Sequence, residues 1–198
     1  MTVVIVDGES VSASGALAAP DGIDLLRPTD RDAVARLFAA CSAETVRLRF
    51  WGGRREFPRD HLDALLAGPP AEHDAVVAHR GGRDRLVGIA GFAAGPDGRP
   101  GSGELGVLVV DAWQRQGIGT AMIGLLLARA RARGVEQVVA NVLPGRHGLL
   151  AALGRRLEPV RASFTGDGLT GVYKLAPTPA PTPTPTGEER GGPHRSCR

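Results

Sequence analysis

The sequence predicts a single α/β domain in which helices cover a central β-sheet. Three observations lead to this prediction. The 198 residues are 42% hydrophobic and 23% charged, which is close to the average of globular domains. Strand-like and helix-like segments alternate through the middle of the chain, and glycine or proline separates them. No apolar run of 18 or more residues occurs, so the sequence contains no candidate transmembrane helix.

The two ends of the chain differ in composition from its middle. Residues 1–22 include a stretch rich in Ser, Ala and Gly, so we expect a flexible N-terminal segment there. Residues 177–198 begin with alternating Pro and Thr, which removes backbone donors and offers no apolar side chains to a core. These residues predict a disordered tail. The folded domain is therefore expected over residues 23–176.

The first half of the domain predicts one strand followed by three helices. Thr29 and Asp32 have the spacing of a capping box for the first helix, with Asp in place of Glu. Ser42 is a candidate cap for the second helix. The expected elements are a strand over 24–26 and helices over 33–41, 43–49 and 58–66.

The second half predicts a meander of three antiparallel strands, then alternating helices and strands. Gly134 would end the long central helix, and Arg129, Arg131 and Arg133 are expected as solvated side chains near that end. The expected strands cover 75–79, 86–94, 104–110, 137–143, 162–164 and 170–175, and the expected helices cover 118–133 and 147–157.

Charge and cysteine content exclude several classes of function. The chain carries 24 Lys and Arg against 21 Asp and Glu, a net charge of +3 that is too small to attract nucleic acid by bulk charge. The two cysteines, Cys41 and Cys197, make no disulfide framework, and the N-terminus lacks the pattern of a signal peptide. The five histidines show no metal-binding spacing. We therefore expect a cytoplasmic protein with no metal and no nucleic-acid or membrane partner.

A glycine-containing turn at residues 114–120 lies between a predicted strand and the central helix. Such a turn lets the backbone approach a ligand, and the first amides of the helix favour an anion; the alternative is a turn that only packs two elements closely. A dinucleotide fingerprint would need a third glycine where Met122 stands, and a phosphate-binding Walker loop would need Gly-Lys-Ser/Thr where the chain has Gly-Thr-Ala. The turn therefore predicts phosphate binding of another kind.

The segment from Val109 to Thr120, Val-Val-Asp-Ala-Trp-Gln-Arg-Gln-Gly-Ile-Gly-Thr, resembles the acyl-CoA signature of the GNAT superfamily of acyltransferases. The resemblance extends from Ile23 to Leu175. The segments 42–50 and 104–109 are similar to those of bacterial Pat-type protein lysine acetyltransferases. This resemblance implies a mixed central sheet flanked by helices and acetyl-CoA as co-substrate.

The resemblance also assigns backbone roles along the chain. It implies that the strand edge at Val107, Leu108 and Val109 pairs with the pantetheine amides, and that the Val107 N–H polarises the thioester carbonyl. The CoA pyrophosphate would bind the backbone amides of Arg115, Gln116, Gly117, Ile118, Gly119 and Thr120. For the side chains of Arg115, Arg129, Arg131 and Arg133, contact with the CoA 3′-phosphate is the alternative to solvation.

Glu104 is the candidate general base. Acyl transfer needs a neutral amine, and a free lysine has a pKa near 10.4, so a nearby carboxylate that takes the proton directly or through water is useful. Strand alternation places Glu104, Gly106 and Leu108 on one face, where Gly106 would leave open volume for the acceptor. The alternative is that Glu104 is a solvated charge at the start of a strand. Its role as base is what the Pat-type resemblance implies.

Two positions depart from the superfamily pattern. Arg146 stands where many members carry an Asn that contacts CoA, and Leu153 stands where many carry a Tyr that protonates the thiolate. A thiolate with a pKa near 8.5 can leave without a dedicated acid. The expected reaction is direct acetyl transfer to a primary amine, preferably a lysine of another protein. A small-molecule amine and a non-catalytic acyl-CoA-binding regulatory domain are the alternatives, and the sequence does not indicate an oligomeric state.

Overall fold

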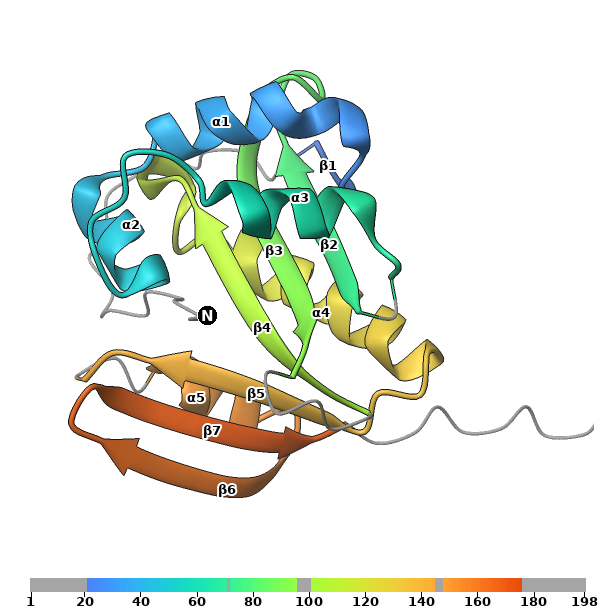
Figure 1. The fold of residues 1–198 in the computed structure, drawn as a ribbon, viewed down its shortest axis with the longest axis vertical. Coiled ribbons are helices and arrows are strands. Elements are labelled where there is room, and N and C mark those ends of the chain that lie inside the picture. The colour runs from blue at the N-terminus through green and yellow to red at the C-terminus, as the bar shows by residue number, and fades with distance from the viewer. Residues whose placement is uncertain (1–20, 71, 96–100, 145–147, 176–198) are drawn as a thin grey trace, which may run out of the picture.

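A computed structural model of the chain describes residues 21–70, 72–95, 101–144 and 148–175 (Figure 1). The predicted N-terminal segment and the Pro/Thr-rich tail lie almost entirely outside the described residues, and so does Arg146. What the sequence predicts for these two segments and for Arg146 therefore remains a prediction.

A seven-stranded mixed sheet forms the centre of the domain, which confirms the predicted fold class. The strand order is β1-β2-β3-β4-β5-β7-β6, with β4 and β5 parallel and every other neighbouring pair antiparallel. The predicted meander is β2, β3 and β4. The strands are β1 (Gly22–Leu25), β2 (His73–His79), β3 (Leu86–Ala94), β4 (Ser102–Val109), β5 (Gln137–Val142), β6 (Glu158–Thr165) and β7 (Gly168–Lys174).

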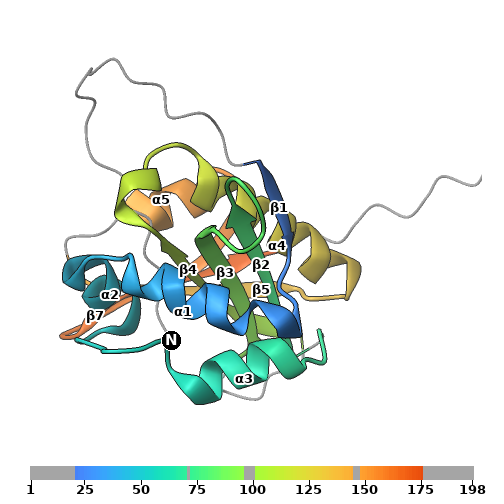
Figure 2. The ribbon, with the colours of Figure 1, turned by 90° about the horizontal axis from the view of Figure 1, so that it is seen from above.

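Helices cover both faces of this sheet, as Figure 2 shows from above. One face carries α1 (Arg31–Ala39), α2 (Ala43–Phe50) and α3 (Arg59–Ala67), and the other carries α4 (Ile118–Ala132) and α5 (Gly148–Gly154). Two short 3₁₀ helices, η1 (Pro28–Asp30) and η2 (Asp111–Trp113), precede α1 and follow β4.

The two faces of β4 belong to two separate hydrophobic cores. Leu105 and Val107 are buried with the side chains of α4, whereas Leu108 is buried with those of α1, α2 and α3. This is the alternation that the sequence predicts for a strand with both faces covered. The same alternation puts Glu104 and Gly106 on the face of α2.

The first helix begins differently from the prediction. Thr29 lies inside η1, and it is the Asp30 carboxylate that accepts a hydrogen bond from the Arg27 backbone N–H at 2.8 Å, so the Thr29–Asp32 capping pair is wrong. The Ser42 cap is confirmed, because Ser42 Oγ accepts a hydrogen bond from the Thr45 N–H at 3.1 Å.

Two further expected boundaries shift. Strand β6 spans Glu158–Thr165 rather than 162–164, because its proline and its exposed polar residues hide the strand period on the edge of the sheet. Helix α5 ends at Gly154 rather than at residue 157.

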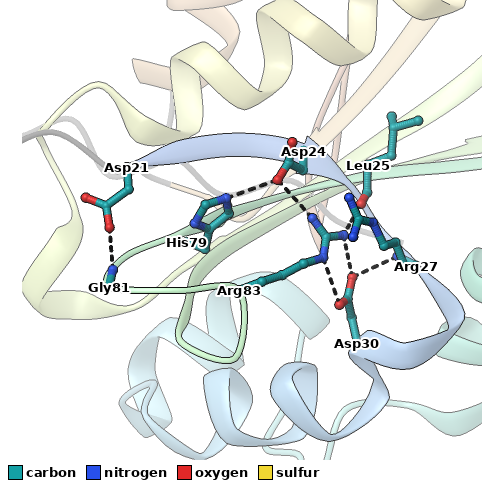
Figure 3. A network of polar contacts seen from close by, with 8 residues as sticks. All are labelled: Asp21, Asp24, Leu25, Arg27, Asp30, His79, Gly81 and Arg83. Carbon is teal, nitrogen blue, oxygen red and sulfur yellow. Dashed lines mark hydrogen bonds and ion pairs between the residues drawn. The ribbon is translucent and has the colours of Figure 1, made fainter.

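A polar network fixes the short edge strand β1 (Figure 3). Arg83, in the β2–β3 loop, donates from Nη1 to Asp24 at 2.9 Å, from Nε to Asp30 Oδ1 at 3.1 Å and from Nη2 to Asp30 Oδ2 at 2.7 Å. It also donates to the Leu25 carbonyl. Because Asp30 is only 4% exposed, this guanidinium supplies the partner that a buried carboxylate needs. The network holds β1 and the start of α1 against the sheet.

Candidate active site

Strands β4 and β5 separate beyond their first residues. They pair at only three positions, Ser102 with Gln137, Gly103 with Val138 and Glu104 with Val139. Figure 1 shows the two strands diverging from there toward α2. On its other side β4 stays paired with β3 as far as Val109. Within the described strands, β4 therefore has an open backbone edge after Glu104.

The direction of the backbone groups on this edge follows from two hydrogen bonds. The Val110 N–H donates to the Val87 carbonyl at 3.0 Å, toward β3, and the Val109 carbonyl accepts from Gln114 Nε2 at 3.0 Å on the opposite side. Since successive residues of a strand alternate direction, the Val107 N–H points to the open edge. Leu108 directs its backbone groups to β3 and its side chain into the core of α1–α3. The edge can thus pair with an extended amide-containing ligand.

The predicted glycine turn joins this edge to α4. Gly117 has φ of 80° and forms the N-cap of the helix, and the preceding Arg115 also has a positive φ of 61°. The Ala121 N–H is bonded to the Gly117 carbonyl at 2.9 Å. The amides of Ile118, Gly119 and Thr120 lie before this first helical bond and are the donors that a helix start leaves to a ligand. An anion bound there would lie at the end of the open β4 edge.

Glu104 lies inside the protein at the point where β4 and β5 part. Its side chain is only 5% exposed, so the alternative of a solvated charge is wrong. Asn141 Nδ2, on β5, donates to Glu104 Oε1 at 2.9 Å, and Asn141 Oδ1 accepts from Thr170 Oγ1, on β7, at 2.6 Å. Three adjacent strands therefore fix the position of this carboxylate.

Arg49 of α2 fills the space beside Gly106. Its Nη2 lies 2.0 Å from the position of a β-carbon on residue 106, so the volume that the sequence predicts to be open is occupied by a guanidinium. The side chain is 3% exposed. Burial lowers the pKa of Arg49 to about 10, and the nearby Glu104 charge opposes this shift. Arg49 therefore stays protonated near neutral pH.

A pocket of about 400 Å³ opens in front of Arg49. Its lining residues come from α2, the α2–α3 loop, α3 and β5: Arg49, Phe50, Trp51, Arg54, Pro58, His61 and Asn141. Glu104 stands behind Asn141 rather than in the wall itself. Asn141 therefore lies between the pocket and the Glu104 carboxylate, to which it is hydrogen-bonded.

His61 contributes an uncharged ring to this pocket. The ring stacks on Phe57, with centroids 5.7 Å apart and planes 7° from parallel. Burial, followed by the charge of Arg49 and by His73, lowers the pKa of His61 to about 3. The imidazole is therefore neutral in the ordinary pH range.

The position of α2 is fixed from the turn after β4. The Asp111 carboxylate accepts hydrogen bonds from the Ser42 N–H and Ser42 Oγ, both at 2.7 Å, and from Thr45 Oγ1 at 2.8 Å. Gln114 Nε2 also donates to Thr45 Oγ1 at 3.1 Å. The segments 42–50 and 109–120, which the sequence marks separately, are thus bonded to each other. This arrangement places Arg49 over β4.

The residues that sequence reasoning missed are Arg49, Asn141 and His61. Asn141 is a half-buried polar residue in a largely apolar strand, and Arg49 stands among the buried positions of α2, so each carried a weak signal. Leu153, at the position of the superfamily's tyrosine, is a core residue. Tyr173 donates its hydroxyl to the Leu150 carbonyl at 2.8 Å, and burial raises its pKa. Tyr173 is therefore a structural residue.

Neither a metal-ion cluster nor a helix able to span a membrane occurs in the described part of the chain. Residues 21–70, 72–95, 101–144 and 148–175 contain no group of three His, Cys, Asp or Glu side chains arranged to hold a metal ion. None of the helices in these ranges combines the length and apolar character that a membrane span requires.

The chain is similar to known proteins both in sequence pattern and in fold. The family model described as "Acetyltransferase (GNAT) family" matches residues 38–155, more than half of the chain. The fold is similar to the GNAT domain of PAT from S. lividans, with a TM-score of 0.68 and 20% identity over 77% of this chain and 89% of that one. No curated protein sequence matches the chain significantly.

Two further solved structures share the fold. One is yncA from Salmonella typhimurium with its cofactor acetyl-CoA, with a TM-score of 0.60 and 18% identity over 83% of this chain and 98% of that one. The other is a ribosomal-protein-alanine N-acetyltransferase from Brucella melitensis, with a TM-score of 0.60 and 20% identity over 77% of this chain and 97% of that one.

Proposed function

Because the chain belongs to the GNAT family of acetyltransferases, we propose that it moves an acetyl group from acetyl-CoA directly to a primary amine, with Glu104 as general base. Acetyl-CoA is the co-substrate. The observation that carries the proposal is the hydrogen bond of 2.9 Å from Asn141 to Glu104, which sets a carboxylate behind a pocket at the fork of β4 and β5.

The open edge of β4 and the turn before α4 fit a CoA thioester. The pantetheine amides would pair with the backbone of Val107 and Val109, and the Val107 N–H would polarise the thioester carbonyl. The pyrophosphate would bind the backbone amides from Arg115 to Thr120. These roles use the backbone alone, so they do not depend on the side chains of the signature.

Glu104 would remove the proton that the amine must lose. The pocket wall in front of it is Asn141, so a water held between the acceptor amine and the carboxylate is the shortest route for that proton. The amine nitrogen then forms the new C–N bond as the C–S bond breaks. The thiolate needs no protein acid, because its pKa near 8.5 makes it a good leaving group.

Replacing Glu104 by Gln tests the role of the carboxylate. The change keeps the hydrogen-bonding shape but removes the basicity, so kcat should fall by roughly 100-fold at neutral pH. Calorimetry should find acetyl-CoA affinity nearly unchanged. The matched control is Glu158→Gln on exposed β6, which should leave both quantities unchanged. Turnover of the Glu104 variant within about twofold of the wild type would show that another group is the base.

The identity of the acceptor distinguishes the alternative functions. A lysine of another protein is the acceptor that the Pat-like segments 42–50 and 104–109 favour. A pocket of about 400 Å³ with a buried arginine in its wall instead favours a compact acceptor. Release of free CoA thiol on addition of amines distinguishes an enzyme from a binding domain that senses acyl-CoA without turnover. A cytoplasmic location is part of this proposal, and the two cysteines, which make no disulfide framework, support it.

A further inference from the structure

We propose that the acceptor is a free amino acid or a similar small amine with a carboxylate nearby, and that Arg49 binds this carboxylate. The proposal rests on the acetyl transfer proposed above and names its substrate class. It begins from one observation: a buried arginine lines a pocket, and one of its donors has no hydrogen-bond partner among the described residues.

Arg49 lines the pocket and is 3% exposed, yet among the described residues its Nη1 has no hydrogen-bond partner. Burying a charged donor without a partner is costly, and a guanidinium is matched best by the two oxygens of a carboxylate. Glu104 balances part of the charge from the side of β4. The pocket side of the guanidinium is left for a ligand.

A second unsatisfied nitrogen borders the same pocket. His61 Nε2 is buried and has no hydrogen-bond partner among the described residues. Because the ring is neutral, this atom can donate to a carboxylate oxygen in one tautomer without adding charge. Arg49 and His61 thus offer two donors from two different helices.

The charge of the pocket argues against an acceptor that is only a cation. Among the residues that the structure describes, its charged lining residues are Arg49 and the exposed Arg54, and the Glu104 carboxylate lies behind Asn141. A simple alkylammonium would meet net repulsion here. An acceptor that brings its own carboxylate neutralises Arg49 while its amine approaches Glu104.

The placement of these groups on β4 suits an acceptor that carries both an amine and a carboxylate. Arg49 lies over Gly106, and the backbone of Glu104 is two residues earlier on the same face of β4, roughly 7 Å along an extended strand. The amine and carboxylate of an α-amino acid are separated by one carbon, so the carboxylate can meet Arg49 while the amine is turned toward Glu104 through a bridging water. Phe50 and Trp51 would contact the rest of the molecule.

The experiment compares matched acceptors on the whole chain of 198 residues. Free amino acids, their carboxamides and the corresponding decarboxylated amines are assayed with acetyl-CoA by release of CoA thiol, beside lysine-containing peptides. The proposal expects at least one amino acid whose kcat/KM exceeds that of its amide and amine by tenfold or more. Equal rates for the acid and its amide, or turnover of lysine peptides alone, would overturn it. Absence of CoA release with every amine would instead refute the proposed function.

A variant of Arg49 and a binding measurement distinguish a loss of amino-acid recognition from a loss of folding. Arg49→Lys keeps the charge but loses the forked donor, so the preference for the acid over its amide should fall to within about threefold. Quenching of Trp51 fluorescence reports binding of the amino acid without turnover, with Trp51→Phe as the control that removes the signal. A folded Arg49→Lys protein that keeps its full preference for the acid would overturn the assignment of Arg49.

Discussion

The guanidinium of Arg49 occupies the place that a side chain on residue 106 would need. Its Nη2 and Cζ lie 2.0 Å and 2.5 Å from the position of a β-carbon there. Gly106 is therefore required because a charged group from another element passes against the strand. This pair connects α2 to the strand that carries Glu104.

Gly106→Ala should displace Arg49. The added methyl group cannot coexist with the guanidinium, and a buried arginine has little room to move, so we expect a loss of about 1–3 kcal/mol in the free energy of unfolding. Acetyl transfer should also fall, because the pocket wall changes. Urea denaturation and kcat/KM measure the two effects.

Gly124→Ala is the matched control for this change. Gly124 lies inside α4, and a β-carbon there meets no atom within 4 Å. Alanine has the higher helix propensity, so the free energy of unfolding should rise by about 0.5–1 kcal/mol. If both glycine variants behaved alike, the crowding at residue 106 would not be the cause.

Gly119→Asp should weaken acetyl-CoA binding. The carboxylate adds negative charge in the first turn of α4, where the pyrophosphate is expected. Calorimetry should find an affinity at least tenfold lower, about 1.4 kcal/mol. Gly119→Ala adds bulk without charge, so it should lose less acetyl-CoA affinity than Gly119→Asp. Unchanged binding by a folded Asp variant would contradict the assignment of the turn.

Asp111→Ala should destabilise the protein at neutral pH but not in acid. Burial alone would raise the pKa of Asp111, but hydrogen bonds from Ser42 and Thr45 outweigh it and lower the pKa. A carboxylate with a depressed pKa contributes stability above its unfolded value of about 3.9, and that contribution disappears as the pH falls through the lower folded value.

Urea denaturation of the wild type and Asp111→Ala at several pH values checks this expectation. The difference between the two proteins should be constant from pH 7 down to about 5 and should shrink below about pH 3.9. Ser42→Ala made in both backgrounds should show non-additive effects, because Ser42 Oγ and Asp111 are bonded at 2.7 Å. A difference that persists unchanged at pH 3 would mean that Asp111 acts through packing rather than charge.

The sequence predicted most elements because glycine and proline mark their ends. The strand expected over 86–94 is β3, and the helix expected over 118–133 is α4 within one residue. The alternation of side chains along a strand also predicted that Glu104 shares one face of β4 with Gly106 and Leu108. It could not predict that Asn141, 37 residues away, bonds to Glu104, because that contact depends on which strands become neighbours. The contact of Arg49 with Gly106 was missed for the same reason.

The arginines at the end of α4 were predicted to be solvated, and for two of them this is wrong. Arg129 donates to Asp74 from Nε at 2.8 Å and from Nη2 at 3.2 Å, and Arg133 donates from Nη1 at 2.6 Å. Asp74 lies on β2 and its side chain is 5% exposed. The sequence offered no way to pair an aspartate at the start of one strand with the far end of a later helix.

Asp74→Ala should therefore be strongly destabilising. It leaves two partly buried guanidinium groups without their shared carboxylate, and removing one partner of a buried ion pair costs about 3 kcal/mol or more. The control is Asp63→Ala, which removes the partner of Arg31 in a surface pair whose side chains are 57% and 49% exposed. That change should cost no more than about 1 kcal/mol. Urea denaturation of both variants at pH 7 measures the difference, and equal losses would show that Asp74 is not held as a buried partner of α4.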